Sequence, residues 1–199
     1  MSSRRVPAPN SALHTTILER ASELFAENGY EEVSMRQIAK AAGCSATAIY
    51  LFFESKDDLL FTVVEDAFEQ FVAAMDAAAA SSGSPRDRLA AIGMAYIEFA
   101  IARPLDFRLM FIDKPKFLLA PSVRDRAPRL NALAALRNTV GEILDLPPTA
   151  PPVLVAADAL WGGVHGIAVL HVSRLGFTAE RAREAGTLQT RLMSTGLGH

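Results

Sequence analysis

The chain has 199 residues, half of them hydrophobic, and a net charge of −2. This length and apolar content are enough for a buried core, and they exclude extended disorder over most of the chain. The slight acidity excludes strong attraction to nucleic acid through overall charge. The single cysteine, Cys44, excludes an intrachain disulfide and fits a reducing compartment, so we expect a cytoplasmic protein.

Residues 1–10 contain two prolines and show no periodicity, which predicts a flexible N-terminal arm. Because this segment has no apolar stretch, we expect no signal peptide. From residue 11 onward apolar residues recur at helical spacing, and Asn28-Gly29 predicts the end of this first helix. The apolar positions are Leu13, Ile17, Ala21, Leu24 and Phe25.

Residues 35–53 predict two short helices joined by a tight turn. Ser34 is placed to cap the first of them, with Gln37 three residues later as in a capping box. Gly43 accepts the positive φ that the turn needs, because it has no Cβ. Ser45 is placed to cap the second short helix through its hydroxyl oxygen.

The second short helix has an inner and an outer side. Ile49 and Phe53 lie one turn apart and are predicted to be buried, whereas Tyr50 and residues 45–47 face the other way. Phe52 is predicted to fold back onto its own domain. Two short helices in this arrangement form a helix-turn-helix, whose second helix can enter a major groove of DNA.

A long helix is predicted from Ser55 to about Ala80, with Asp58 completing the cap at its start. Its length of about 37 Å would join a DNA-binding head to a second domain. The segment SSGSPRD, residues 81–87, predicts its end. The inward stripe consists of Leu59, Val63, Ala67, Phe71 and Met75.

Three further segments complete the first part of the predicted body. A helix is expected over about 86–102, and another turn of helix begins at Pro104. Residues 113–121 read as a loop, because they combine prolines and lysines. A helix from Leu130 to Leu144 then ends before the prolines at 147–148.

Residues 152–175 are apolar on nearly every side and are long enough to span a bilayer. Asp158, His165 and His171 argue against a membrane span, since a central Asp costs about 2.5–3.5 kcal/mol on insertion scales. We therefore expect no membrane association and a soluble helix that is covered on every side, one face by its own chain and the other by a partner. A last helix over about 178–195 presents Ala182, Ala185, Leu188 and Leu192 on one face, and two such helices from each of two subunits would form a four-helix homodimer interface.

The segment from Ser34 to Gly43, followed by Ser45, Ile49-Tyr50, Phe53 to Lys56, Leu59 and Leu60, resembles the DNA-binding segment of TetR-family transcriptional regulators. The resemblance covers about residues 11–60. Family members often carry polar residues where this chain has Leu51 and Phe52. Further along, Trp161, His165 and Gly166 resemble the ligand-binding domain of the TetR subgroup named for its Trp-His-Gly signature.

The resemblance implies an all-α fold with an N-terminal three-helix bundle that contains the helix-turn-helix and a larger C-terminal helical domain for ligand binding and dimerisation. The expected boundaries are a flexible arm over 1–10, a DNA-binding domain over 11–56 and an effector-binding and dimerisation domain over 57–199. It also implies a ligand-responsive repressor, binding a near-palindromic operator on double-stranded DNA as a homodimer. The long helix would connect the two sites.

The resemblance also assigns residues to DNA. Tyr50 and Lys56 are expected to contact phosphates, and Ser34 and Arg36 lie at a helix N-terminus where they either touch phosphate or serve as ordinary capping and surface residues. Base contacts are expected from residues 45–47, which are Ser45, Ala46 and Thr47. The first sixty residues contain six basic and eight acidic residues, a net charge of −2. A modest, salt-sensitive affinity for DNA follows.

A small apolar or aromatic effector is expected in the C-terminal domain, because aromatic residues and methionines are concentrated there. Most of them belong to the core, and some border the effector cavity. Trp161 and His165 either line or support that cavity, or His165 is a hydrogen-bonded core residue. The candidate ligand-binding residues are Phe71, Met75, Phe99, Phe107, Met110, Phe111, Trp161 and His165.

Two other functions remain open at the level of the sequence. The acidic head suggests a helical small-molecule carrier or sensor that does not bind DNA. Asp158 and His165 suggest an acid–base pair of a small helical enzyme. No nucleophile, metal-ligand set or glycine-rich phosphate loop accompanies that pair, so we expect no enzyme, no metal and no cofactor. Cys44 is either a redox-sensing thiol or a buried, inert one.

Overall fold

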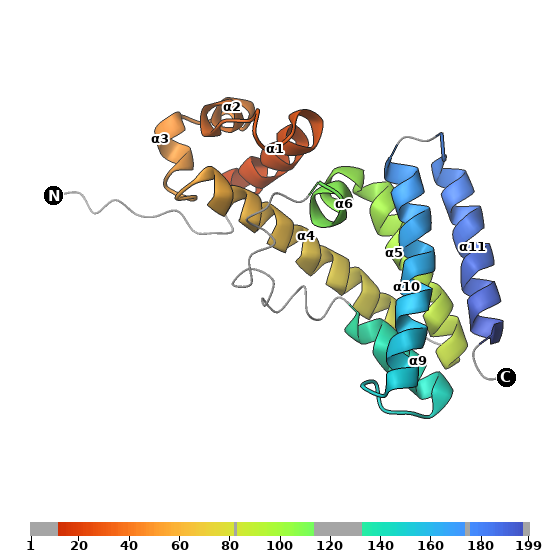
Figure 1. Cartoon of the computed structure of the whole chain (residues 1–199). Helices are drawn as coiled ribbons and strands as arrows, with labels where there is room; N and C mark the ends of the chain where they lie inside the picture. The colour runs from red at the N-terminus through yellow and green to blue at the C-terminus, as the bar shows by residue number, and fades with distance from the viewer. Residues whose placement is uncertain (1–11, 82, 114–132, 174–175, 197–199) are drawn as a thin grey trace.

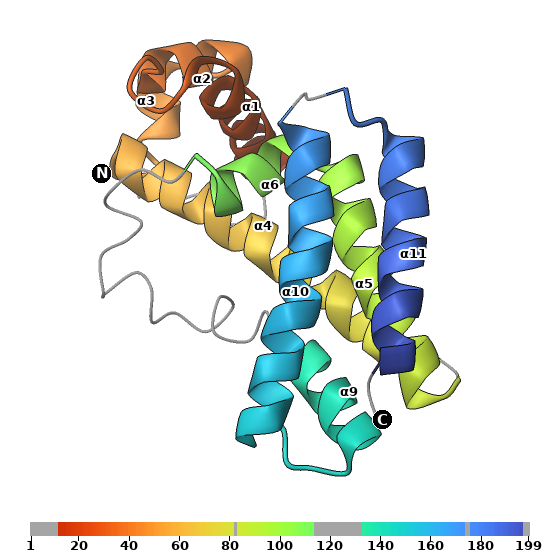
Figure 2. The ribbon, with the colours of Figure 1, turned by 45° about the vertical axis from the view of Figure 1, so that its right-hand side comes forward.

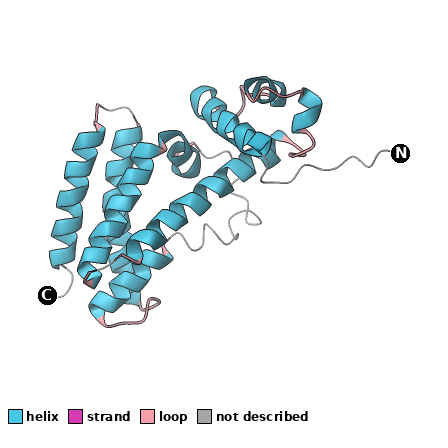
Figure 3. Ribbon diagram, turned by 180° about the vertical axis from the view of Figure 1, so that it is seen from behind, coloured by secondary structure: helices cyan, strands magenta, loops and turns pink. Residues whose placement is uncertain are grey.

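The computed structural model describes residues 12–81, 83–113, 133–173 and 176–196. Within these ranges all regular secondary structure is helical, which confirms the all-α prediction (Figure 3). The predicted arm over residues 1–10, most of the predicted loop over 113–121 and the predicted helix start at Leu130 lie outside the described residues.

The head of the molecule consists of α1 (Ala12–Asn28), α2 (Met35–Ala41), α3 (Ala46–Ile49) and the beginning of α4 (Lys56–Ala79). These helices enclose a small core to which Ile17, Phe25, Ile38, Ile49 and Phe53 each contribute a fully or almost fully buried side chain. The expectation that Ile49 and Phe53 point inward is therefore confirmed. Figure 1 shows the head at one end of α4, with the short α6 (Pro104–Phe111) lying next to it.

Two glycines set the turns of the head. Gly29 has a φ of +83°, and its backbone N–H donates to the Phe25 carbonyl over 3.0 Å to close α1. Gly43 has a φ of +70° between α2 and α3. Both conformations are strained for a residue with a Cβ, so these two positions fix where α1 ends and how α3 turns from α2.

The body of the molecule is a helical bundle built around α5 (Pro85–Ala102), which contacts α4, α9 (Ala134–Leu144), α10 (Pro151–Val172) and α11 (Ala179–Gly196). The short α6 contacts α1 as well as α4 and α5. In Figure 2, α10 and α11 run side by side with α5 behind them. The long α4 packs on α1 in the head and on α5 and α9 in the body, so it is shared by both parts.

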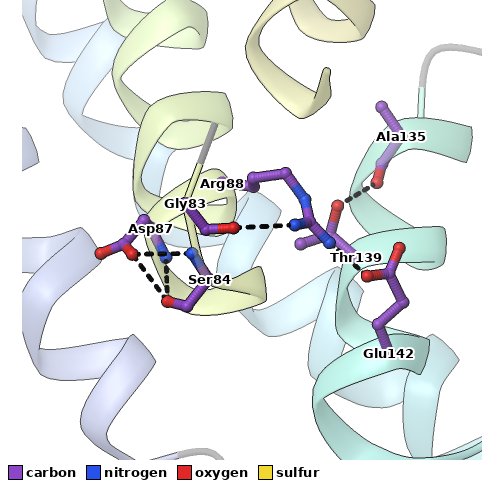
Figure 4. A network of polar contacts seen from close by, with 7 residues as sticks. All are labelled: Gly83, Ser84, Asp87, Arg88, Ala135, Thr139 and Glu142. Carbon is purple, nitrogen blue, oxygen red and sulfur yellow. Dashed lines mark hydrogen bonds and ion pairs between the residues drawn. The ribbon is translucent and has the colours of Figure 1, made fainter. Parts of the chain in front are cut away.

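Polar contacts hold the beginning of α5 against α9 (Figure 4). Ser84 and Asp87 form a capping box at the start of α5, in which the Ser84 hydroxyl accepts the backbone N–H of Asp87. Arg88 then donates to the Gly83 carbonyl over 3.1 Å and forms an ion pair with Glu142 of α9. These contacts fix two helices that also form walls of the pocket described below.

The helices α10 and α11 each leave large apolar side chains exposed. Helix α10 is long and apolar enough to cross a membrane by length and composition, yet one of its sides is packed in the bundle through Val153, Ala157 and Val164. Its other side is exposed, with Val155 at 70%, which leaves open the face that was expected to pack on a partner. On α11 the residues expected on one apolar face lie on two different sides of the helix, one buried and one exposed.

Ala182 of α11 is buried against the bundle together with Gly186 and Thr190, whereas Leu188 and Leu192 are 57% and 60% exposed. The prediction that Ala182 shares a face with the two leucines was therefore wrong. At 100° per residue, positions 182, 186 and 190 form one stripe, and positions 188 and 192 lie on the opposite half of the helix. Large apolar side chains are therefore exposed on both helices, Val155 and Leu170 on α10 and Leu188 and Leu192 on α11.

Candidate nucleic-acid interface and ligand pocket

The front edge of α3 is presented to solvent. The Ser45 side chain accepts the Ala48 backbone N–H over 3.1 Å, which caps the helix as predicted. Ser45, Ala46 and Thr47 are all exposed, while Ile49 on the other side is completely buried. The hydrophobic anchor at Ile49 therefore turns the small side chains 45–47 outward, as an element that enters a DNA groove requires.

Tyr50 and Phe52 follow α3, and they differ in the direction of their side chains. Tyr50 is 55% exposed, and its hydroxyl makes no hydrogen bond to any residue in the described ranges. The Phe52 ring packs 5.8 Å from the His14 ring and 6.3 Å from the Phe53 ring. The prediction that Phe52 folds back is confirmed, and Tyr50 keeps a hydroxyl available for an external acceptor such as a phosphate.

At the start of α2, Ser34 forms the predicted capping box. Its hydroxyl donates to Gln37 Oε1 over 2.7 Å and accepts the Gln37 backbone N–H over 3.3 Å, so this side chain is engaged in capping. Arg36 and Lys40 on the same helix are exposed and form no hydrogen bond or ion pair with the described residues. They provide positive charge beside the α3 edge.

Lys56 begins α4 and is half-buried. Its ammonium donates to the Tyr30 carbonyl over 2.8 Å and to the Glu31 carbonyl over 3.4 Å, and it lies 4.1 Å from the centre of the Tyr30 ring. Two of its three N–H donors therefore tie α4 to the segment between α1 and α2. The third donor is left for an external anion.

Cys44 lies in the turn of the motif and is half-buried. Burial raises the pKa of its thiol, because the thiolate would lose solvation. A raised thiol pKa lowers the thiolate fraction and with it the reactivity. This favours the inert interpretation over the redox sensor.

The head is joined to the body by a buried polar contact that could not be predicted from the sequence. Ser22 of α1 donates its hydroxyl hydrogen to Asp106 Oδ1 of α6 over 2.5 Å, and Arg103 Nε donates to the other carboxylate oxygen over 2.5 Å. Ser22 and Asp106 are both buried. In addition, Arg108 of α6 donates to the Ala26 carbonyl of α1 over 3.3 Å. Helix α6 is thus hydrogen-bonded to the head.

An aromatic cluster fills the body beneath α6. The Phe71 ring packs edge-to-face on Tyr96 at 5.1 Å and on Phe99 at 5.2 Å. The Phe107 and Phe111 rings lie 4.9 Å apart and contact the His165 ring at 5.8 and 5.4 Å. Met110 is also buried. Four of the eight candidate ligand residues are therefore buried in the core, namely Phe71, Phe99, Phe107 and Met110, while Phe111 and His165 are half-buried beside them.

His165 is hydrogen-bonded within this cluster. Its Nδ1 lies 2.7 Å from the Tyr96 hydroxyl, which also accepts the Trp161 Nε1–H over 3.3 Å. Burial raises the pKa of the Tyr96 phenol, which keeps it protonated and able to donate. His165 is thus a half-buried, hydrogen-bonded residue packed beside the core, whereas Trp161 lies on the wall of a pocket.

That pocket lies between α4, α5, α9, α10 and α11 and has a volume of about 30 Å³, enough for about two water molecules. Met75 and Trp161 are the two candidate residues on its wall. The other wall residues include Leu89, Leu136, Leu160, Gln189 and Met193. The lining is mainly apolar, as small-molecule pockets are.

The sequence did not predict that α11 contributes Gln189, Thr190 and Met193 to the pocket wall. A glutamine on an amphipathic helix ordinarily lies on the surface, so the sequence contains no signal that Gln189 faces inward. The acid–base pair suggested for an enzyme is not formed, because Asp158 is exposed and has no contact with His165. Across the described ranges no three His, Cys, Asp or Glu side chains gather in a way that would hold a metal ion.

Two family models match this chain. The one described as "Bacterial regulatory proteins, tetR family" matches residues 17–63, which contain α2 and α3. The one described as "Tetracyclin repressor-like, C-terminal domain" matches residues 89–195, more than half of the chain. The chain belongs to the TetR family. Helices α2 and α3 are the helix-turn-helix of a DNA-binding transcriptional regulator.

Individual relatives agree with this assignment. The regulator is 33% identical over 76 residues to the fatty acid metabolism regulator protein of Bacillus subtilis, a match to 38% of this chain and 39% of that protein. It spans less than half the length of the curated relatives that it matches.

Two solved structures have the same fold. A structure of the fatty acid degradation regulator FadR from Bacillus halodurans has a TM-score of 0.80 at 18% identity, covering 96% of this chain and 98% of that one. FadR from Bacillus subtilis in complex with stearoyl-CoA has a TM-score of 0.72 at 19% identity, covering 92% and 98%. At these identities the two structures establish the fold of the regulator.

Proposed function

We propose that this regulator is a ligand-responsive repressor that binds a near-palindromic operator as a homodimer and has no enzymatic activity. The observation that carries the proposal is the exposed edge of α3 at residues 45–47, anchored from behind by the buried Ile49. A helix edge of small side chains fits the major groove, where hydroxyl groups and methyl groups distinguish base pairs.

Contacts to DNA divide between bases and phosphates. Ser45, Ala46 and Thr47 contact base edges. The exposed Tyr50 hydroxyl and the Arg36 guanidinium contact phosphates, and the third N–H of Lys56 is available for the same purpose. Ser34 acts through its capping box, which fixes the start of α2 and hence the position of Arg36.

The second subunit packs on α10 and α11. Val155 and Leu170 of α10 and Leu188 and Leu192 of α11 are exposed, and large apolar side chains gathered on two neighbouring helices mark a protein interface. Pairing these helices with their copies forms a four-helix bundle that fixes the distance between the two heads. Replacing Leu188 and Leu192 with glutamate should yield a monomer in sedimentation and abolish operator binding.

The effector is a small apolar molecule held in the pocket beside Trp161. The named relatives regulate fatty acid metabolism, and one solved structure contains stearoyl-CoA, which supports an effector with a hydrocarbon part. We assign the C-terminal domain to the Trp-His-Gly subgroup on the basis of Trp161, His165 and Gly166. An effector lowers operator affinity only by binding more tightly to the conformation with the wrong head spacing. We propose a cytoplasmic location, as for other soluble regulators of this family.

Selection of bound fragments from a random DNA pool, followed by gel shifts, tests this function. Recovery of an inverted repeat, with an affinity that falls steeply as salt rises, is the expected result. Tyr50→Phe should weaken binding to all sequences alike, whereas Thr47→Ala should relax sequence preference. Gln70→Leu, an exposed change on α4, serves as the control. Failure to retain any DNA at low salt would instead support a helical carrier.

A further inference from the structure

The pocket between α4, α5, α9, α10 and α11 contains no charged side chain among the described residues of its wall. Its polar groups are the Tyr96 hydroxyl, the Trp161 indole N–H, the Thr190 hydroxyl and the Gln189 amide. An ion buried here would therefore lack a counter-charge. Burying an unpaired ion is far more costly than burying a neutral polar group that finds a hydrogen bond.

Three of these four polar groups already have partners within the protein. The Trp161 N–H donates to the Tyr96 oxygen over 3.3 Å, and the Tyr96 hydroxyl pairs with His165 Nδ1 over 2.7 Å. The Thr190 hydroxyl donates to the Gly186 carbonyl over 2.9 Å. Each of the three is already hydrogen-bonded within the protein and is not the first group that a ligand meets.

Gln189 is the exception. Its side-chain amide makes no hydrogen bond to any residue in the described part of the chain. The amide lies directly over Gly163 of α10, where an added Cβ would be only 1.9 Å from Gln189 Nε2. The glycine therefore provides the space in which the amide lies at the pocket wall.

We propose that Gln189 recognises the effector, and that the buried part of the effector is neutral: an apolar skeleton with a carbonyl or hydroxyl oxygen that hydrogen-bonds to this amide. The inference rests on the proposed function of the pocket as the effector site. An amide both donates and accepts, so it serves an alcohol, ester, thioester or ketone equally. A free carboxylate meets no cation among the described residues of this wall and is rejected.

The size of the cavity sets a further condition. A volume of about 30 Å³ admits about two water molecules, so a chain-like ligand enters only if wall residues move. Met75 and Met193 are on the wall and are unbranched, and such side chains adopt new rotamers at low cost. A linear, flexible apolar ligand is therefore favoured over a bulky rigid one.

Trp161 is the single tryptophan of the chain and lies on the pocket wall, so its fluorescence reports occupancy directly in the full-length protein. The probes are 1-decanol and sodium decanoate, which share a ten-carbon skeleton and differ in charge at about pH 8. We expect decanol to bind and decanoate to bind at least roughly tenfold more weakly. Isothermal titration calorimetry of the same pair provides a second measurement.

Three variants isolate Gln189. Gln189→Leu should weaken decanol binding roughly fivefold to tenfold, the usual effect of one lost hydrogen bond. Gly163→Ala should act in the same direction, because the new Cβ displaces the amide. Gln189→Lys should reverse the preference and let decanoate bind, since it adds the missing cation. Gln70→Leu makes the same chemical change outside the pocket and should leave both affinities unchanged.

The proposal is overturned if decanoate binds as tightly as decanol, if neither probe binds, or if Gln189→Leu behaves like Gln70→Leu. Gel shifts with the selected operator, carried out without probe, test the repressor function separately. A protein that binds the operator but neither probe loses this inference alone. A protein that binds decanol through Gln189 but retains no DNA keeps this inference and loses the proposed repressor function.

Discussion

The buried contact between Ser22 and Asp106 joins the DNA-binding head to the body, and its removal has a calculable effect. The hydroxyl of Ser22 lies 2.5 Å from Asp106 Oδ1, the short distance that is typical of a hydrogen bond to an ionised carboxylate. Because Arg103 holds the other oxygen over 2.5 Å, the carboxylate keeps one partner when the hydroxyl is removed. We expect Ser22→Ala to lower the free energy of unfolding by about 1.5–3 kcal/mol, the range for a hydrogen bond to a charged group.

A double-mutant cycle with Asp106→Ala, which removes the acceptor oxygen, separates this contact from other effects of the two substitutions. Urea unfolding at one fixed protein concentration provides the four free energies, since the stability of a dimer depends on concentration. The coupling free energy should reach at least about 1 kcal/mol, as for other residues in direct contact. Thr16→Val removes a hydroxyl from the exposed side of the same helix and should change stability by less than about 0.5 kcal/mol.

The functional consequence concerns operator affinity. Helix α6 carries Phe107, whose ring packs 5.9 Å from the ring of Tyr96 on the pocket wall, and holds α1 through Asp106, so it connects the pocket to the head. Ser22→Ala should weaken the effect of an effector on operator binding more than it weakens operator binding itself. The reasoning is refuted if the coupling free energy is zero within error, or if Ser22→Ala and Thr16→Val are indistinguishable in both assays.

Further predictions concern close packing and pH. Gly93→Ala should destabilise the protein by about 1–3 kcal/mol, because the new Cβ would lie 2.5 Å from Thr190 Cγ2. Gly162→Ala meets no atom within 4 Å and should stabilise an isolated subunit by about 0.5–1 kcal/mol; denaturation midpoints check both. Arg183 lowers the pKa of Glu98 below its ordinary value of 4.5 by donating two hydrogen bonds. The contribution of this ion pair to the free energy of unfolding is therefore complete above about pH 4.5, and it is lost as the pH falls through the lowered pKa of Glu98 in the folded protein. Both side chains are nearly half exposed, so the loss is below about 1 kcal/mol, and Glu98→Gln should remove it from a comparison of unfolding at neutral and acid pH.

The sequence by itself determined the local structure of the head. Ser34, Gln37 and Ser45 formed the predicted caps, and Gly29 and Gly43 adopted the positive φ that their turns required. These features depend on neighbours within a few residues along the chain. Local hydrogen bonds and backbone strain are therefore sufficient to specify the helix-turn-helix, including which side of α3 is exposed.

Only the tertiary structure decided the pocket and the connections between helices. Helical periodicity indicates that Phe71, Phe107 and Trp161 are apolar positions, but not that the first two are in the core while the third borders a cavity. Periodicity likewise does not reveal the position of Gln189, because glutamine is a polar residue that is ordinarily exposed. Its inward direction follows from Gly163 on a neighbouring helix, more than twenty positions away in the chain.

The contact between Ser22 and Asp106 shows the physical reason most clearly. The two residues are 84 positions apart, and each is an ordinary polar residue of a helix. Their hydrogen bond exists because the packing of α6 on α1 removes both from water, and a buried carboxylate without partners would be too costly. Propensity and periodicity act along one helix, whereas packing and desolvation act between helices, so the sequence specified the elements of this regulator and their assembly specified its sites.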